Sequence, residues 1–135
     1  MPQRRRRSDC PIHFALETFG DRWTLLVLRD VLLKGRSTYT DFLMAEEGIA
    51  TNILADRLTS LQRDGLLARA PGGRYRPTTK AIDLLPVLVE MILWSARHDP
   101  DTATPAAFVQ RARDDRAALL AELRTALTET DDRTP

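Results

Sequence analysis

Residues able to carry covalent or metal chemistry are few in this chain of 135 residues. Cys10 is the single cysteine, and His13 and His98 are the two histidines. One cysteine excludes an internal disulfide, and these three residues lack the spacing of a zinc site, so we expect neither a metal nor a cofactor. The chain has no glycine-rich phosphate loop and no Ser/His/Asp grouping, and the approach of His13 to Glu17 is one that a single helical turn produces by chance. These patterns argue against an enzyme.

Hydrogen bonding to base edges is a second kind of chemistry, and it fits residues 51–64. Four polar side chains recur there at helical spacing and share one face: Asn52, Asp56, Thr59 and Arg63. Three leucines mark the opposite face: Leu54, Leu58 and Leu61. Asparagine can bond adenine with two hydrogen bonds, and arginine can bond guanine or phosphate. Any solvated surface helix has a similar face, so this row alone leaves both interpretations open.

Cations near a predicted hairpin suit contacts with phosphate. Arg74 and Arg76 flank Tyr75 in an extended run and therefore point to the same side. Charges that keep an exposed strand edge from pairing are the alternative. Arg4 to Arg7 form a basic arm that could enter a minor groove or serve only as a solubilising tail.

The charge is divided unevenly along the chain. The net charge is +1, but residues 1–80 hold 14 Lys+Arg and 9 Asp+Glu, whereas residues 81–135 hold 6 and 10. A basic front and an acidic back indicate a surface that binds a polyanion and a second part with another role, such as subunit pairing. With 43% hydrophobic and 29% charged residues, the chain is of globular type. No apolar run reaches the ~18 residues of a membrane span, and we expect a cytoplasmic protein without membrane contacts.

The periodicity predicts a mostly α-helical protein with a small β-hairpin. Helices are expected from Pro11 to Gly20, from Arg22 to Gly35, from Tyr39 to Ala45 with Ser37 or Thr38 as cap, and over Thr51 to Asp64. A hairpin around the PGG run follows, then a long helix capped by Thr78 or Thr79 and kinked at Pro86. We divide the chain into a disordered basic arm (1–9), a winged helix-turn-helix domain (10–97), a linker (98–104) and one amphipathic helix (105–130).

The stretch from Cys10 to Trp94 resembles the HxlR-type winged helix-turn-helix transcriptional regulators, which are related to the MarR group. The resemblance covers about 85 residues, and the motifs that carry it are Cys10-Pro11, GDRWTLLVLRDVLLKG, Tyr39-Thr40-Asp41-Phe42, GIATNILADRLTSLQRDGLL and RYRPTTKAIDLLPVL. It implies a bacterial homodimer that binds double-stranded DNA, with the first and last helices forming the dimer and one recognition helix per subunit. A near-palindromic site with half-sites ~10 bp apart, or a multiple of that, would match such a dimer.

The sequence departs from the family pattern at several positions. Ser37 and Thr38 stand where a basic pair often precedes the aromatic residue, so Arg36 is our substitute for a phosphate contact beside Tyr39. Ala50 stands where a serine often caps the recognition helix, which shifts the expected cap to Thr51. The helix from Thr104 onward extends past the usual end, and its one-sided leucines predict an enlarged dimer interface.

Cys10 is the position at which some family members sense oxidants or electrophiles. A helix N-terminus and neighbouring arginines favour a reactive thiol, which could pair only with another molecule. A small capping or packing residue without a redox role is the alternative. Aromatic residues at helical positions are predicted to be core: Phe14, Phe19, Trp23 and Trp94. A ligand pocket lined by them at a dimer interface is the alternative, so a small-molecule effector is left open.

The sequence therefore predicts a homodimeric, sequence-specific DNA-binding regulator, with a winged-helix module that binds another protein as the alternative. Thr51 and Asn52 are the first candidates for base contacts, and Arg57 and Arg63 the next. Arg74 and Arg76 are the candidates for phosphate contacts, and a steep dependence of affinity on salt would separate DNA binding from protein binding.

Overall fold

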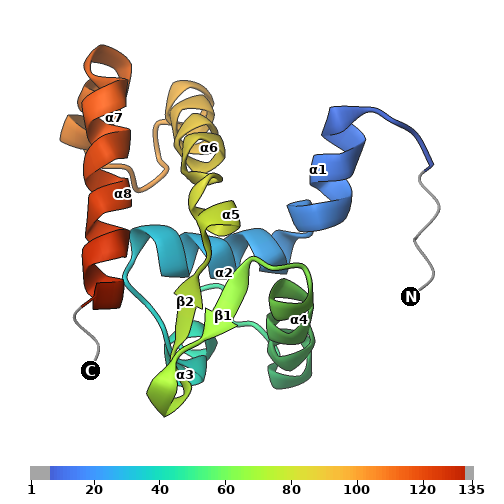
Figure 1. Ribbon diagram of the computed structural model, residues 1–135. Helices are drawn as coiled ribbons and strands as arrows, with labels where there is room; N and C mark the ends of the chain where they lie inside the picture. Colours follow the sequence, from blue (N-terminus) through green and yellow to red (C-terminus); the bar gives the residue numbers. More distant parts are fainter. Residues whose placement is uncertain (1–6, 133–135) are drawn as a thin grey trace.

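The computed structural model describes residues 7–132 of the chain. Arg4 to Arg6 of the predicted basic arm lie outside the described residues, and Arg7 to Asp9 are exposed and form no helix or strand. The elements follow one another along the chain (Figure 1) as α1 (Pro11–Phe19), α2 (Arg22–Leu33), α3 (Tyr39–Leu43), α4 (Thr51–Arg63), β1 (Leu67–Arg69), the 3₁₀ turn η1 (Pro71–Gly73), β2 (Tyr75–Pro77), α5 (Thr79–Ile82), α6 (Leu85–His98), α7 (Ala106–Asp114) and α8 (Arg116–Asp132). The predicted fold class, a mostly helical winged helix-turn-helix, is confirmed.

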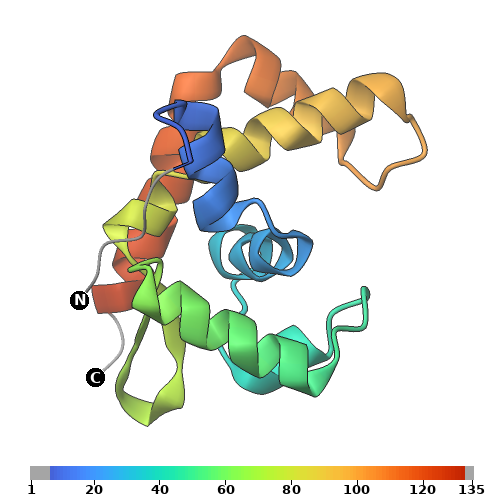
Figure 2. The same cartoon turned by 90° about the vertical axis from the view of Figure 1, so that its right-hand side faces the viewer.

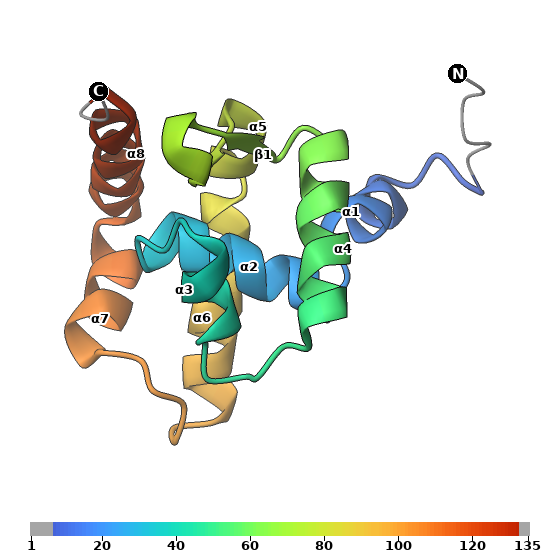
Figure 3. The ribbon, with the colours of Figure 1, turned by 90° about the horizontal axis from the view of Figure 1, so that it is seen from below.

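Helix α2 runs through the middle of the molecule and contacts α4, β2 and α8. Its apolar residues face the core, where Leu28 is 1% exposed, and Asp21 caps its start by accepting a hydrogen bond from the Thr24 N–H at 3.1 Å. Seen from below, α3, α4 and the hairpin lie in front of α2, and α6 lies behind it (Figure 3). The helix-turn-helix unit and the hairpin therefore share one side of α2.

The hairpin forms where the sequence predicted it. Leu67 pairs with Pro77 and Arg69 with Tyr75 in an antiparallel register. The two glycines of the turn, Gly72 and Gly73, have φ values of 85° and 80°, which side chains other than glycine rarely adopt. The backbone N–H of Tyr75 also donates to the Ser37 carbonyl at 2.7 Å, and the Tyr75 ring packs on Phe42. These contacts anchor the hairpin to the segment that enters α3.

The long helix predicted from Thr79 with a kink at Pro86 is instead two helices, and the expectation of a kink was wrong. Helix α5 ends at Ile82, and Pro86 lies in the first turn of α6. A proline there sacrifices no helical hydrogen bond, so the chain starts a new helix rather than bending an old one. Thr78, one of the two predicted caps, accepts a hydrogen bond from the Ala81 N–H.

The single helix predicted for residues 105–130 is also two helices. The first helix ends at Asp114, because the φ of −145° and ψ of 53° at Asp115 are not helical. Helix α8 begins at the next residue. The leucines that suggested an unpaired stripe pack inside their own protomer. Leu119 is 5% exposed in a cluster with Val89 and Leu93, and three further leucines pack against the core: Leu120, Leu123 and Leu127.

Helix α1, by contrast, buries none of its residues. Ile12, Phe14 and Leu16 are 70%, 56% and 60% exposed, and α1 projects from the body of the molecule (Figure 1). The prediction that the aromatic residues are core holds for Phe19 and Trp23, which pack against the core. It was wrong for Phe14 and for Trp94, which is 62% exposed and lies against the His98 ring at a tilt of 44°. Exposed apolar side chains are therefore concentrated on α1 and α6.

Candidate nucleic-acid interface

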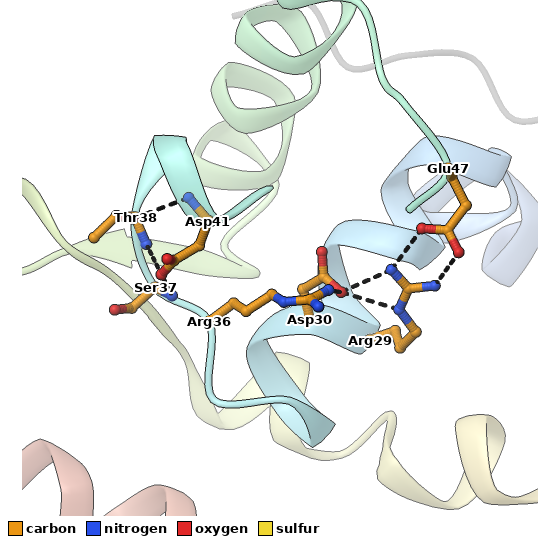
Figure 4. A network of polar contacts seen from close by, with 7 residues as sticks. All are labelled: Arg29, Asp30, Arg36, Ser37, Thr38, Asp41 and Glu47. Carbon is orange, nitrogen blue, oxygen red and sulfur yellow. Dashed lines mark hydrogen bonds and ion pairs between the residues drawn. The ribbon is translucent and has the colours of Figure 1, made fainter. Parts of the chain in front are cut away.

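Helix α3 is short, and its start is held by a capping box. The Thr38 hydroxyl accepts from the Asp41 N–H at 3.1 Å, which confirms one of the two predicted caps. The Asp41 carboxylate in turn accepts from the N–H groups of Ser37 and Thr38 at 3.0 and 3.1 Å. These hydrogen bonds, that of Ser37 first, lower the pKa of Asp41 below its ordinary value. They fix the entry into the helix-turn-helix unit (Figure 4).

A buried carboxylate ties this entry to α2. Asp30 is 2% exposed, and its Oδ1 accepts from Arg29 Nε and Nη2 at 3.0 and 2.8 Å and from Arg36 Nη1 at 2.7 Å. The Asp30 carbonyl also accepts from the Arg36 N–H. Arg36, predicted as a phosphate contact, therefore has its guanidinium directed at Asp30 (Figure 4).

Arg29 extends the same network to the turn between α3 and α4. Its Nη1 and Nη2 donate to the two carboxylate oxygens of Glu47 at 2.7 and 2.9 Å. This paired geometry is the strongest form of a carboxylate–guanidinium contact. The hydrogen bond from Arg29 is the main reason that the pKa of Glu47 falls to about 2. The turn that positions α4 is thus held by charge as well as by packing.

Helix α4 presents the face that the sequence predicted. Leu54, Leu58 and Leu61 are at most 2% exposed. The four residues of the polar row are exposed: Asn52, Asp56, Thr59 and Arg63. The expected cap was wrong, because Thr51 is the first helical residue and Ala50, in an extended conformation, holds the cap position without a side-chain hydrogen bond.

Three of the predicted site residues on α4 make ion pairs within the protein: Arg57 and Asp56, and Arg63, whose Nε lies 3.5 Å from Asp64 Oδ1. Arg57 Nε donates to Asp21 Oδ2 at 2.8 Å, and Arg57 Nη1 donates to Asp56 Oδ2 at 2.7 Å. The Arg57 contact is also the first cause of the lowered pKa of Asp21. Sequence reasoning missed Asp21, although its place just before α2 is that of a helix cap. Asp21 therefore has two roles: it caps α2, and through Arg57 it helps to orient α4.

The remaining predicted residues lie around α4. The Tyr39 hydroxyl donates to the Thr51 carbonyl at 3.3 Å, which links α3 to the first turn of α4. Arg74 and Arg76 are exposed on the hairpin, as their alternation with the buried Tyr75 predicted. The hairpin, α3 and α4 extend from the same side of α2 (Figure 3). The structure thus assembles helix-turn-helix, polar row and basic hairpin on one surface.

Known proteins resemble this chain in sequence. Residues 18–102, more than half of the chain, match HxlR-like helix-turn-helix proteins. The chain belongs to this family. An uncharacterised helix-turn-helix transcriptional regulator of Synechocystis, sll1512, is 32% identical over 88 residues, covering 61% of this chain and 64% of that protein. Rv3095 of Mycobacterium tuberculosis, with the same description, is 33% identical over 97 residues, covering 67% and 60%. This HxlR-like chain thus spans less than two thirds of the length of these relatives.

Solved structures agree with the family. PA1607, described as a candidate transcription factor, matches with a TM-score of 0.64 and 32% identity over 73% of each chain. The quinone-bound YodB of B. subtilis matches with a TM-score of 0.56 and 28% identity, covering 65% of this chain and 98% of that one. Within residues 7–132 of the HxlR-like chain, no helix is long and apolar enough to cross a membrane, and no three potential metal ligands cluster.

The ion pair at the turn predicts how stability changes with pH. Because folding lowers the pKa of Glu47 from 4.5 to about 2, the pair stabilises the fold above pH 4.5, and this contribution is lost as the pH falls through about 2. We expect Glu47→Gln to flatten this part of the pH dependence, measured as urea unfolding midpoints at several pH values across that range. Glu46→Gln, at an exposed neighbour without an ion pair among the described residues, is the control. A Glu47→Gln profile parallel to that of the wild type would contradict the role given to the pair.

Proposed function

We propose that the chain is a homodimeric, sequence-specific DNA-binding transcriptional regulator that inserts α4 into the major groove. The observation that carries the proposal is the polar row of α4, which is exposed opposite a fully buried leucine row and lies on the same side of α2 as the basic hairpin. A helix of this kind, placed next to a wing, reads base edges while the wing contacts the backbone. The family and its transcription-regulator relatives support the same function.

The contacts within the protein divide the site residues by role. Thr51, Asn52 and Arg63 are exposed, and we assign base contacts to the first two and a base or phosphate contact to Arg63. Arg57 and Asp56 bond each other, and Arg57 also bonds Asp21, so we assign Arg57 to positioning α4.

Phosphate contacts are assigned to the hairpin and to the start of α3. Arg74 and Arg76 supply the cations, and Tyr39, which is 37% exposed beside the first turn of α4, can donate its hydroxyl to a phosphate. Arg36 would have to leave Asp30 to reach DNA, so it is the weakest of the predicted contacts.

Two substitutions separate base reading from backbone binding. Asn52→Ala should relax the preference at one or two base pairs, whereas Arg74→Ala should weaken binding to all duplexes alike and reduce the salt slope by ~1. Fluorescence anisotropy with the DNA upstream of the gene and a scrambled duplex, at two salt concentrations, measures both. Equal losses on both duplexes for Asn52→Ala would contradict base reading. Weak, salt-independent binding to every duplex would instead favour a protein-binding module.

Homodimer formation is proposed from the exposed apolar residues. Ile12, Phe14 and Leu16 on α1 and Met91 and Trp94 on α6 are 45–70% exposed, which is unusual for side chains of this size in a monomer. Because the leucines of α8 pack within the protomer, we assign the interface to α1 and α6. The enlarged interface expected of the C-terminal helices is no longer needed to explain their leucines.

Trp94→Ala should weaken self-association about tenfold or more, since large aromatic side chains are the usual anchors of such interfaces. Sedimentation velocity over a dilution series gives the dissociation constant of the dimer. Met44→Ala, at a 76% exposed residue beside the turn of the helix-turn-helix, is the matched control and should leave that constant unchanged. A monomeric wild type, or a Trp94→Ala dimer of unchanged strength, would refute the assignment.

Response to a thiol oxidant or electrophile is proposed for Cys10. The residue is exposed and holds the cap position of α1, the helix assigned to the dimer interface, so a modification there would disturb subunit pairing. The quinone bound to YodB supports an electrophile as the class of effector.

Diamide should therefore release wild-type protein from its DNA, and Cys10→Ser should stay bound under the same treatment. Anisotropy before and after diamide, followed by reduction, measures the effect and its reversal. Undiminished release from Cys10→Ser would show that the cysteine is not the sensor.

A further inference from the structure

An open groove lies on the side of α2 away from α1. Its volume is about 730 Å³, and its walls come from α2, α6, the segment between α6 and α7, and α7. Figure 2 looks nearly along the axis of α2. The segment between α6 and α7 and the turn between α3 and α4 both lie to the right of α2, the first above the second. A volume of this size is typical of small-molecule sites.

The floor of the groove is apolar. Leu33 and Leu88 contribute from the two central helices, Ile92 and Met91 from the outer part of α6, and Phe108 from α7. Met91 is 45% exposed in the single chain, and it belongs both to this lining and to the α6 residues assigned to the dimer interface. The floor fits the hydrocarbon or aromatic body of a ligand better than it fits a polar one.

The rim carries more cations than carboxylates. Its cations are Arg29, Lys34 and Arg36, and its carboxylates are Glu46 and Glu47. The two arginines are bonded to Asp30, and Arg29 also to Glu47. Lys34 is exposed, and its ammonium makes no hydrogen bond or ion pair with any described residue, although its charge helps to lower the pKa of Glu47. An ammonium above an apolar floor is complementary to a ligand with one negative charge.

We propose that this groove binds a small carboxylate with an apolar body and that the ligand acts on the helix-turn-helix through Arg29. The carboxylate bonds Lys34 and competes with Glu47 for the guanidinium of Arg29. Because the Arg29–Glu47 pair holds the turn before α4, a ligand that takes Arg29 loosens that turn and weakens DNA binding. This coupling rests on the proposed function, whereas binding in the groove does not.

Part of the groove is formed by residues outside the family match. Thr104, Phe108 and Leu123 lie beyond residues 18–102. Thr104 precedes α7, Phe108 lies on α7, and Leu123 lies on α8, whose leucines pack against α2 and α6. The C-terminal part of the chain therefore contributes to the wall of the groove.

Calorimetric titration of the full chain without DNA tests the site directly. The probes are naphthalene-2-carboxylate and its neutral analogue naphthalene-2-carboxamide. We expect the carboxylate to bind with a dissociation constant on the order of 1 mM or below and the amide to bind about tenfold more weakly, because it lacks the charged contact with Lys34. Absence of binding at millimolar carboxylate, or equal affinities for the two probes, would overturn the proposal.

Variants locate the probe in the groove. Lys34→Gln should weaken carboxylate binding about tenfold and leave amide binding unchanged. Arg113→Gln, at an exposed cation of α7 that does not line the groove, is the matched control. Ser95→Trp, which places bulk in the groove, should abolish binding of both probes while circular dichroism shows an intact fold. Carboxylate binding that survives both Lys34→Gln and Ser95→Trp would place the probe elsewhere and refute the site.

The link to DNA has its own measurement. Glu47→Gln frees Arg29 and should tighten carboxylate binding about threefold. Carboxylate at saturation should weaken wild-type DNA binding by about threefold or more. Unchanged DNA affinity in the presence of bound carboxylate would refute the coupling but not the site. If the chain bound the carboxylate as expected but bound no DNA, that result would refute the proposed function and would leave the ligand site standing.

Discussion

The carboxylate of Asp30 is a charge removed almost completely from water, and the arrangement of α3 and of the turn before α4 depends on how that charge is matched. A buried ion whose partners are lost costs several kcal/mol, because nothing else replaces its hydration. Arg29 and Arg36 supply three donors to one oxygen of Asp30. Since Arg36 precedes α3 and Arg29 reaches the turn after it, both ends of this short helix are set by the same charge. A five-residue helix with little intrinsic stability thereby acquires a defined position.

Local patterns in the sequence were sufficient for most of the elements. Thr38 before Asp41 is a capping signal, and two glycines after Pro71 specify a turn. The leucine row of α4 gave its buried face correctly, because burial in a helix follows from spacing alone. Breaks were harder, since the pattern around Pro86 or Asp115 is compatible with one bent helix or with two.

Contacts between distant residues were not predictable from spacing. The pairing of Asp21 with Arg57 joins residues 36 positions apart and engages a side chain that spacing had made a candidate for base contacts. In the same way, the side chain of Arg36, a predicted phosphate contact, is bonded to Asp30 instead. The leucines of α8 were misassigned for a related reason. A row of leucines on one face of a helix does not show whether it packs against another subunit or against the same chain. Their partner is the α2–α6 core.

The exposed position of α1 has a consequence for the energetics of assembly. Helix α1 has nine residues, none of them fully buried, and is shorter than the ~12–15 residues at which isolated helices become even marginally stable in water. A partner that covered Ile12, Phe14 and Leu16 would therefore order the backbone of α1 as it bound. The measured free energy of association would then equal the contact free energy less the entropic cost of ordering α1. The heat-capacity change of association would be larger than the change expected for two rigid surfaces. If that partner is a second copy of the chain, the average helix content would rise with protein concentration, because folding of α1 and assembly would be one equilibrium.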